Sequence, residues 1–181
     1  MNITFVPLNE SHFSLMLKWL ESSHVKKWWD QDIVYTLDLV KEKYRSYVQG
    51  YKQISGINKP ISAFIIYASS EPIGYIQIYK ASDFPRSKPL TGLPENLGAF
   101  DIFIGEEKYL GQNIGSKAIL KFLSLYGGAY FHIFADPDIN NIAAIKTYEK
   151  AGFKKLSEQK DISEVWMLWK KEQLLLERNY E

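Results

Sequence analysis

The sequence predicts a mixed α/β sheet in one domain, and three observations support this class. Candidate helices and strands follow one another in the order αα, ββ, βαβα, ββ, which combines hairpins with crossover units. The 181 residues, 46% of them hydrophobic and 24% charged, suit one hydrophobic core of ordinary size. No repeat, linker or low-complexity tract divides the sequence. We therefore expect residues 1–181 to form a single domain.

The first half of the chain predicts one strand, two helices and a hairpin. In order, the expected elements are a strand at 3–6, a helix carrying Phe13 to Leu20, a helix from Leu37 to Val48, and antiparallel strands at 61–68 and 72–79. Asn9 or Ser11 is the expected N-cap of the first helix and Thr36 that of the second, because these side chains accept hydrogen bonds from first-turn N–H groups.

The second half predicts a long loop followed by alternating strands and helices. The expected elements are the loop at 81–97, a strand at 98–105, a helix at 113–126, a strand at 130–135, a helix at 140–151, and closing strands at 153–158 and 163–169. The loop contains three prolines, and loops of this length are often functional. The polar tail from Lys170 is expected to continue as a helix or to fray.

Composition excludes several classes of function. Lys plus Arg number 22 and Asp plus Glu 21, so no overall field favours nucleic acid or an anionic membrane. The absence of cysteine excludes thiolate metal sites and a cysteine nucleophile, and His12, His24 and His132 lack metal-ligand spacing, so we expect no metal. The N-terminus has no signal-peptide pattern and no segment reaches about 20 apolar residues. A cytoplasmic location is the expectation.

A glycine-spaced turn, Leu110-Gly-Gln-Asn-Ile-Gly-Ser-Lys117, lies between a predicted strand and a predicted helix. Backbone N–H groups at a helix start, together with the helix dipole, bind phosphate oxygens. The spacing differs from that of a P-loop and from the G-x-G-x-x-G dinucleotide pattern. Taken alone, the turn fits equally well a phosphate site or a helix start whose small residues only make the bend.

The helix at 140–151 adds a second chemical feature. Asn141, Ala144 and Tyr148 are spaced by three and four residues, so they share one helix face, and Gly152 is typical of a helix stop. Singly, Asn141 is also typical of a cap and Tyr148 of a core aromatic. Combined with the anion-binding turn, the amide and the phenol predict a site for a phosphorylated cofactor.

These two segments resemble motifs A and B of the Gcn5-related N-acetyltransferase (GNAT) superfamily, and the order of elements resembles its sheet over most of the chain. The resemblance implies a mostly antiparallel sheet with splayed central strands, flanked by helices. It implies acetyl-coenzyme A as co-substrate, an acceptor-binding half at 1–97, a cofactor-binding core at 98–153 and a polar tail at 170–181. The implied cofactor-binding residues are Ile102, Phe103, Ile104, Gln112, Asn113, Ile114, Gly115, Ser116, Lys117, Asn141, Ala144, Tyr148 and Lys150.

The turn departs from the family motif at two positions. Leu110 stands where Arg or Gln is usual, and Asn113 replaces a glycine. Asn tolerates the left-handed backbone conformation better than other non-glycine residues, so we expect the turn to keep its shape. Leu110 removes one side-chain contact to the cofactor.

Four further segments are similar to aminoglycoside 6′-N-acetyltransferases: Val25-Lys-Lys-Trp-Trp29, Glu71-Pro-Ile-Gly-Tyr-Ile-Gln-Ile-Tyr79, Gly98-Ala-Phe-Asp101 and Ala135-Asp-Pro-Asp138. This likeness implies a small polycationic acceptor, acetylated at its 6′-amine, and a protein that is a monomer or a homodimer. It implies Asp101 as general base and Tyr148 as general acid. The implied substrate-binding residues are Trp28, Trp29, Gln77, Tyr79, Asp101 and Asp136.

The chemistry requires such groups on independent grounds. An ammonium must lose a proton before its nitrogen attacks a thioester, and a carboxylate, directly or through water, accepts that proton. A phenol with a pKa near 10 is a proton donor for a departing thiolate, and backbone N–H groups around Phe103 are candidates to polarise the thioester oxygen. Because the chain has no cysteine, we expect direct transfer in a ternary complex.

Structural explanations remain open for the acceptor residues. Asp101 is also compatible with a carboxylate on the solvated face of a sheet, and Asp136, before a proline, with a turn residue. Trp28 and Trp29 are adjacent and cannot share a helical face, so we expect one to be packed and the other to form a cleft wall.

The identity of the acceptor also has alternatives. Asp30, Asp32, Glu95, Asp101, Asp136 and Asp138 are available to hold a polycation. Against this, the 81–97 loop contains Arg86 and Lys88. A hydroxylysine-type amine of siderophore assembly is the alternative acceptor, and a non-catalytic module that binds acyl-coenzyme A or a partner is the alternative class.

Overall fold

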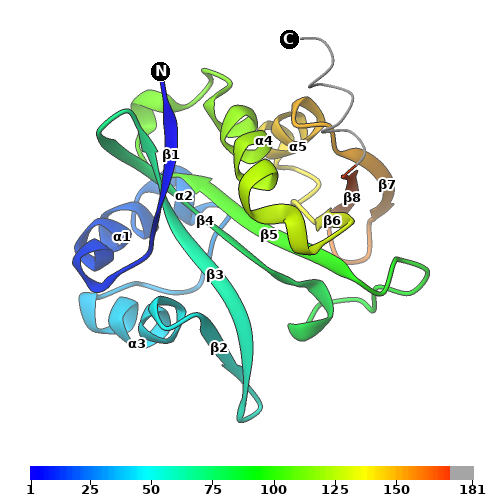
Figure 1. Ribbon diagram of the computed structural model, residues 1–181, viewed down its shortest axis with the longest axis horizontal. Coiled ribbons are helices and arrows are strands. Elements are labelled where there is room, and N and C mark those ends of the chain that lie inside the picture. The colour runs from blue at the N-terminus through cyan, green and yellow to red at the C-terminus, as the bar shows by residue number, and fades with distance from the viewer. Residues whose placement is uncertain (172–181) are drawn as a thin grey trace. The chain divides into compact units, whose positions relative to one another are not determined.

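A computed structural model describes residues 1–171 (Figure 1). These residues group into two compact units. The first unit comprises Met1–Gln77 and Asp101–Gly115, and the second comprises Ile78–Phe100 and 116–171. All but the first two residues of the predicted polar tail at 170–181 lie outside the described residues.

The first unit contains the N-terminal strands and helices. Its elements are β1 (Ile3–Pro7), η1 (Glu10–His12), α1 (Phe13–Leu20), α2 (Ser23–Lys26), α3 (Leu37–Val48), β2 (Tyr51–Ile54), β3 (Ile57–Ala68) and η3 (Glu107–Tyr109). Strand β1 pairs antiparallel with β3, from Ile3 opposite Ala68 to Pro7 opposite Phe64. Helix α3 packs against α1 and against the β2–β3 hairpin (Figure 1).

The second unit contains the C-terminal strands. Its elements are η2 (Ala81–Asp83), η4 (Gly127–Ala129), β6 (His132–Ala135), α5 (Ile142–Lys150), β7 (Lys154–Gln159) and β8 (Glu164–Lys170). Strand β8 pairs antiparallel with both β6 and β7. Three longer elements have residues in both units: β4 (Glu71–Lys80), β5 (Leu97–Ile104) and α4 (Ile114–Tyr126).

The strands follow the order β1-β3-β4-β5-β6-β8-β7, with β2 beside β3, in an eight-stranded sheet. The β5–β6 pair is parallel, whereas β1–β3, β2–β3, β6–β8 and β7–β8 are antiparallel. The predicted mixed α/β class is confirmed. The short elements α2 and β2 were absent from the sequence-based prediction, because neither contains a continuous apolar run or a recognisable periodicity.

The N-cap predicted at Thr36 is confirmed, whereas α1 itself begins after His12, which makes no side-chain capping bond. The Thr36 hydroxyl accepts from the Leu39 N–H at the start of α3, and Asn9 caps η1, the single turn that leads into α1. The prediction that Gly152 ends α5 is also confirmed, because its φ is +86°, a conformation that favours glycine.

Each unit buries its own set of large side chains. In the first unit these include Trp19, Tyr44, Tyr75, Ile66 and Ile73, all fully buried. In the second unit one buried cluster consists of Ala81, Leu97, Ala99, Phe134 and Trp166, with Tyr79, Leu90, Leu93 and Leu168 packed against it. Part of the 81–97 loop therefore contributes to a hydrophobic cluster.

We expect Gly105→Ala to destabilise the protein, because a Cβ at Gly105 would fall inside the buried ring of Trp19. Overpacking of this kind costs about 1–3 kcal/mol in the free energy of unfolding, which urea titration followed by circular dichroism measures. Gly128→Ala is the matched control, because a Cβ there meets no heavy atom within 4 Å. Equal unfolding midpoints for the two variants would contradict this packing argument.

Candidate active site

The first unit contains a cavity of about 280 Å³. Its lining residues are Trp28, Trp29, Asp30, Lys43, Tyr44, Tyr47, Lys52, Gln77 and Asp101. Four of them were predicted to contact the acceptor: Trp28, Trp29, Gln77 and Asp101. The structure thus brings a candidate base, an amide and two indoles together in one cavity.

Asp101 is part of a hydrogen-bonded chain of three side chains. The Gln77 amide donates from Nε2 to Asp101 Oδ2 at 2.5 Å, and the Tyr75 hydroxyl donates to Gln77 Oε1 at 2.6 Å. Tyr75 is fully buried and Gln77 is 8% exposed, whereas Asp101 is half-buried beside the cavity. The carboxylate therefore has one oxygen held by an amide of fixed orientation.

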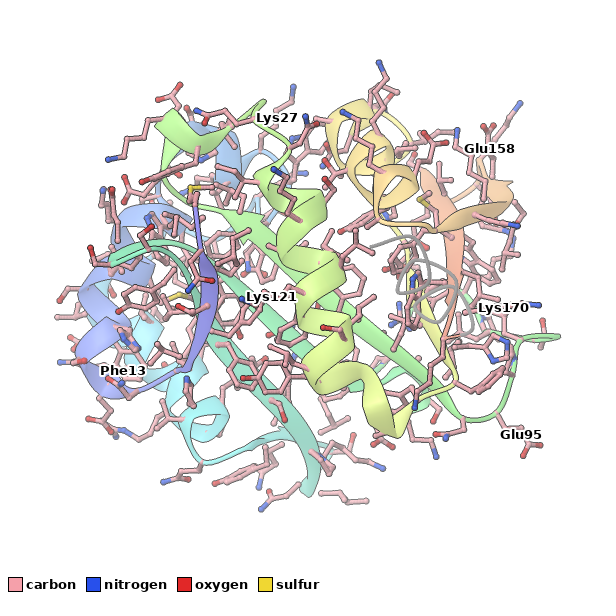
Figure 2. All side chains as sticks on the ribbon, turned by 45° about the horizontal axis from the view of Figure 1, so that its top comes forward. Phe13, Lys27, Glu95, Lys121, Glu158 and Lys170 are labelled. Atoms are coloured by element: carbon pink, nitrogen blue, oxygen red, sulfur yellow. The ribbon has the colours of Figure 1, made fainter. Side chains whose placement is uncertain are left out.

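The tryptophan pair forms part of the cavity wall. Trp29 packs edge-on against Tyr75 and Phe103, with ring centroids 6.0 and 5.0 Å apart. Trp28 carries the Lys27 ammonium over its ring at 4.8 Å, and Lys27 itself is exposed (Figure 2). The expected division is observed in part, since Trp29 is the more tightly packed of the two, although both line the cavity.

Lysines balance the acids of the cavity. Lys43 donates to Asp30 Oδ2 at 2.5 Å and to the Tyr35 hydroxyl at 2.9 Å. Burial lowers the pKa of Lys52, and the nearby Lys43 charge lowers it further, while the negative charges of Asp101 and Asp30 act in the opposite direction. The lining thus contains two aspartates and two lysines, so it is not the acidic cluster expected for a polycation.

Sequence reasoning named Asp30 as an acid available to the acceptor but did not foresee its pairing with Lys43, and it missed four lining residues: Lys43, Tyr44, Tyr47 and Lys52. Tyr44 and Tyr47 do lie on the predicted buried face of α3, but their position beside a cavity depends on the packing of α3 against β2 and β3. Burial raises the pKa of Tyr47, and the charges of Asp101 and Asp30 raise it further. In the sequence, the only indication that Tyr44 and Tyr47 face a polar cavity is the hydroxyl group that each carries on an otherwise apolar ring.

The glycine-spaced turn has the predicted left-handed backbone. Gly111 has φ +73° and Asn113 has φ +58°, so asparagine does replace glycine in this conformation. Helix α4 begins directly afterwards at Ile114, and the Gln112 side chain donates to the Lys108 carbonyl at 2.5 Å. A helix N-terminus preceded by two left-handed residues suits a phosphate group.

Two glutamates anchor the segment before this turn within the first unit. Glu106 accepts from the Lys18 ammonium at 2.5 Å and from the Trp19 indole at 2.8 Å. Glu71 accepts from Lys108 and from the Tyr109 hydroxyl, each at 2.8 Å. These bonds connect the approach to the turn with α1 and β4.

The predicted face of α5 lies in the second unit. Asn141 is the N-cap of α5, and its side-chain oxygen accepts from the Ala144 N–H at 3.1 Å. Tyr148 is 8% exposed and packs edge-on against Phe100, with 5.5 Å between ring centroids, and near Phe153. The cap and the aromatic contact are thus both present, and neither conflicts with a cofactor contact from the same face.

The remaining predicted cofactor residues lie on three segments. Residues 102–104 end strand β5, residues 112–117 form the turn and the first residues of α4, and Lys150 ends α5. The β5–β6 register runs only from Leu97–His132 to Ala99–Phe134, while β5 continues to Ile104. Backbone groups of β5 beyond Ala99 therefore lie outside that register, which fits the implied splaying of the central strands.

Two predicted acceptor residues, Tyr79 and Asp136, belong to the second unit and are not among the residues that line the cavity. Asp136 is ion-paired with Arg86 of the 81–97 loop, and the Arg86 guanidinium lies 4.9 Å from the centre of the Phe134 ring. Tyr79 packs against Phe84, with ring centroids 4.6 Å apart.

Lys88 of the 81–97 loop pairs with Asp161 at 3.0 Å. The loop is therefore fastened by its own cations, while Glu95 on it is exposed (Figure 2).

The chain belongs to the acetyltransferase (GNAT) domain family, whose model matches residues 9–160. It is thus an acetyltransferase that uses acetyl-coenzyme A, which confirms the predicted class and co-substrate. Within the described residues, no cluster of three or more metal-ligating side chains is found. Among residues 1–171, none of the helices combines the length and apolarity needed to cross a membrane.

Relatives with named activities are similar over most of the chain. Aminoglycoside N(6′)-acetyltransferases type 1 of Klebsiella pneumoniae and of Serratia marcescens are each 26% identical over 157 residues, 85% of this chain and 75% of theirs. A structure of AAC(6′)-Ib in complex with paromomycin and acetyl-coenzyme A superposes with a TM-score of 0.80 at 25% identity, covering 95% of both chains. A structure of AAC(6′)-Ib with ribostamycin and coenzyme A has the same values.

We expect the Glu106 contacts to stabilise the fold above about pH 4 and to be lost in acid. Hydrogen bonds from Lys18 and then from Trp19 lower the folded-state pKa of Glu106. The stabilisation is therefore present above the unfolded-state pKa of about 4.3 and disappears as pH falls through the lower folded value. Urea midpoints of wild type and Glu106→Gln should differ at pH 7 and converge at pH 3.

Glu107→Gln is the matched control, because Glu107 is the exposed neighbour of Glu106. It should lower the urea midpoint less than Glu106→Gln at pH 7. A Glu106→Gln deficit that is as large at pH 3 as at pH 7 would show that the carboxylate charge has no part in it.

Proposed function

We propose that this protein transfers the acetyl group of acetyl-coenzyme A to a primary amine held in the first-unit cavity beside Asp101. The observation that carries the proposal is the half-buried Asp101 carboxylate in a cavity lined by Trp28 and Trp29. A carboxylate can accept the proton that the ammonium must lose, and indole faces suit a cationic, ring-shaped ligand. The 6′-amine of an aminoglycoside is the first candidate acceptor.

The relatives support this acceptor. Proteins named aminoglycoside 6′-N-acetyltransferases match 85% of this chain, and AAC(6′)-Ib was solved with paromomycin and with ribostamycin. The tryptophan pair and the Gln77 to Tyr79 strand are among the segments in which this sequence resembles that group.

Asp101 and Tyr148 carry the proposed proton transfers. Acetyl-coenzyme A supplies the thioester whose carbonyl carbon the amine nitrogen attacks. In this proposal, the Asp101 oxygen that Gln77 does not hold takes the ammonium proton, directly or through water. As the C–N bond forms the C–S bond breaks, and the Tyr148 hydroxyl is the proposed proton donor to the departing sulfur, so that coenzyme A leaves as a thiol. The second proton lost by the attacking nitrogen balances the one that Tyr148 gives. The chain has no cysteine, so direct transfer in a ternary complex is proposed.

The proposed cofactor contacts follow from the backbone. The N–H groups of residues 112–117 are suited to a pyrophosphate, because α4 starts there after a left-handed residue. Residues 102–104 of β5, beyond its register with β6, are suited to hydrogen-bond an amide-containing arm. Asn141, Ala144 and Lys150 are the proposed contacts on α5.

A smaller amine with fewer charges is the second candidate acceptor, and two observations favour it. The cavity lining balances Asp30 and Asp101 with Lys43 and Lys52. Asp136, implied to hold a second cation of the acceptor, is already paired with Arg86. A hydroxylysine-type amine therefore fits the charge of the site better than a polycation does.

Thiol release from acetyl-coenzyme A tests the proposed function with kanamycin, tobramycin, lysine and N-hydroxylysine-type amines as acceptors. We expect turnover with at least one amine. Asp101→Asn should lower kcat/KM by about 10²-fold or more, and Tyr148→Phe should lower kcat by about 10²-fold, as expected for lost general base and acid groups. Asp38→Asn, on the exposed side of α3, is the matched control and should retain full activity.

Three outcomes separate the candidates. Turnover restricted to lysine-type amines would favour the second acceptor class. Absence of turnover with every amine, while acetyl-coenzyme A still binds in calorimetry, would favour a non-catalytic module. Full activity of Asp101→Asn would remove Asp101 as the base.

Arg86→Ala tests whether this guanidinium competes with a cationic acceptor. The variant removes one positive charge beside the Asp136 carboxylate, so KM for kanamycin should fall by about fivefold, equivalent to ~1 kcal/mol. KM for a singly charged amine should stay within about twofold. Lys88→Ala removes a cation of the same loop that pairs with Asp161 instead and serves as the control. The same fall in KM for both variants would mean that only the net charge matters.

A further inference from the structure

We infer that Tyr75 and Gln77 are positioning residues that orient Asp101 as the proton acceptor of the reaction. The inference rests on the proposed function, because it assigns to Asp101 the role of base. It adds two residues that touch no reacting atom and act only through the carboxylate. One of them, Gln77, was expected to bind the acceptor itself.

The geometry allows only one arrangement of the hydrogen atoms among the three hydrogen-bonded side chains Tyr75, Gln77 and Asp101. The Asp101 carboxylate can only accept, so the Gln77 group 2.5 Å from Oδ2 must be the NH₂ end of the amide. That orientation turns Gln77 Oε1 toward Tyr75, whose hydroxyl lies 2.6 Å away and must donate. If the amide were reversed, Gln77 Oε1 would face Asp101 Oδ2, and two acceptors would lie against each other. Asp101 therefore determines which end of the Gln77 amide faces it, and the Tyr75 hydroxyl holds the other end of that amide in place.

Tyr75 is the rigidly held member of this series of hydrogen-bonded side chains. Its ring is fully buried and is contacted by three aromatic rings: Phe103 stacked at 5.5 Å, Tyr44 at 5.8 Å and Trp29 at 6.0 Å. Such packing leaves the ring a single rotamer. The hydroxyl consequently points at one place, and the rigidity of the aromatic cluster is passed to a carboxylate at the cavity.

The hydrogen bonds among these three side chains have two consequences for proton transfer. Oδ2 of Asp101 is engaged by Gln77, which leaves Oδ1 to receive the proton from the acceptor amine. A hydrogen bond donated to a carboxylate also stabilises its charged form, which is the form able to accept a proton. Loss of the amide donor should make Asp101 protonate more readily and orient less well.

The test measures pH profiles of kcat and kcat/KM for Gln77→Leu, Tyr75→Phe and the double variant, with the best amine acceptor. Gln77→Leu should lower kcat by about tenfold, a fraction of a general base's contribution, and should move the acid limb to higher pH. Tyr75→Phe should act in the same direction with a smaller effect. Gln77→Glu should move the acid limb furthest, because two adjacent carboxyl groups share a proton. The KM for acetyl-coenzyme A should stay within about twofold, since no cofactor contact is removed.

The double variant distinguishes positioning from general structural damage. If Tyr75 acts only through Gln77, adding Tyr75→Phe to Gln77→Leu should have no further effect on kcat, whereas independent effects would multiply. Gln53→Leu and Tyr67→Phe remove the same groups from β2 and β3 of the same unit and serve as controls. Multiplying effects, or unmoved acid limbs in both single variants, would overturn the inference.

Direct titration of the Asp101 carboxyl keeps the test decisive even if no amine is turned over. In protein labelled with ¹³C at aspartate carboxyl carbons, the Asp101 resonance is assigned from its loss in Asp101→Asn. Its titration midpoint should rise in Gln77→Leu and, by less, in Tyr75→Phe. Equal midpoints in wild type and Gln77→Leu would refute the orienting hydrogen bond, whereas an upward shift without any turnover would support that hydrogen bond and overturn the proposed acetyl transfer.

Discussion

A half-buried carboxylate among aromatic rings is costly unless hydrogen-bond donors compensate its charge, and in the first unit this constraint is met at Asp101 by a single amide. The Tyr75 hydroxyl holds the other end of this amide, and Tyr75 itself is held because Trp29, Tyr44 and Phe103 pack against its ring. The chemistry proposed for the cavity thus depends on hydrophobic packing one layer below it. The same rings that form the wall also define where a proton can be accepted.

Two of the aspartates predicted to hold a cationic acceptor form ion pairs within the protein. Asp30 is engaged by Lys43 in the first unit and Asp136 by Arg86 in the second, so two of the acids available to a polycation already have cationic partners. Each pair also has a structural use, since Lys43 connects α3 to the segment after the tryptophan pair and Arg86 fastens the 81–97 loop. The lysine and the arginine of these pairs lie outside the segments in which the sequence resembles its relatives, so a motif comparison does not reveal them.

Much of the fold could be predicted because its signals are local. Helix caps at Thr36 and Asn141, the hairpin turn before β4 and the helix stop at Gly152 each depend on a few neighbouring residues, and each is found where expected. The left-handed conformation of Asn113 is predictable on the same ground, since asparagine tolerates it. The four-residue elements α2 and β2 could not be predicted, because they lack the continuous apolar run by which the equally short β6 was recognised.

The sequence by itself therefore determined the order of elements, the anion-binding turn and the presence of Asp101, Tyr148 and the tryptophan pair, because these follow from residue type and spacing along one segment. Tertiary structure alone decided which side chains meet. Gln77 donates to Asp101 across 24 positions, Arg86 pairs with Asp136 across 50, and Lys52 reaches the cavity from a strand that no local signal revealed. Ion pairs and hydrogen bonds between distant segments depend on how strands and loops pack, and that information is spread over the whole chain.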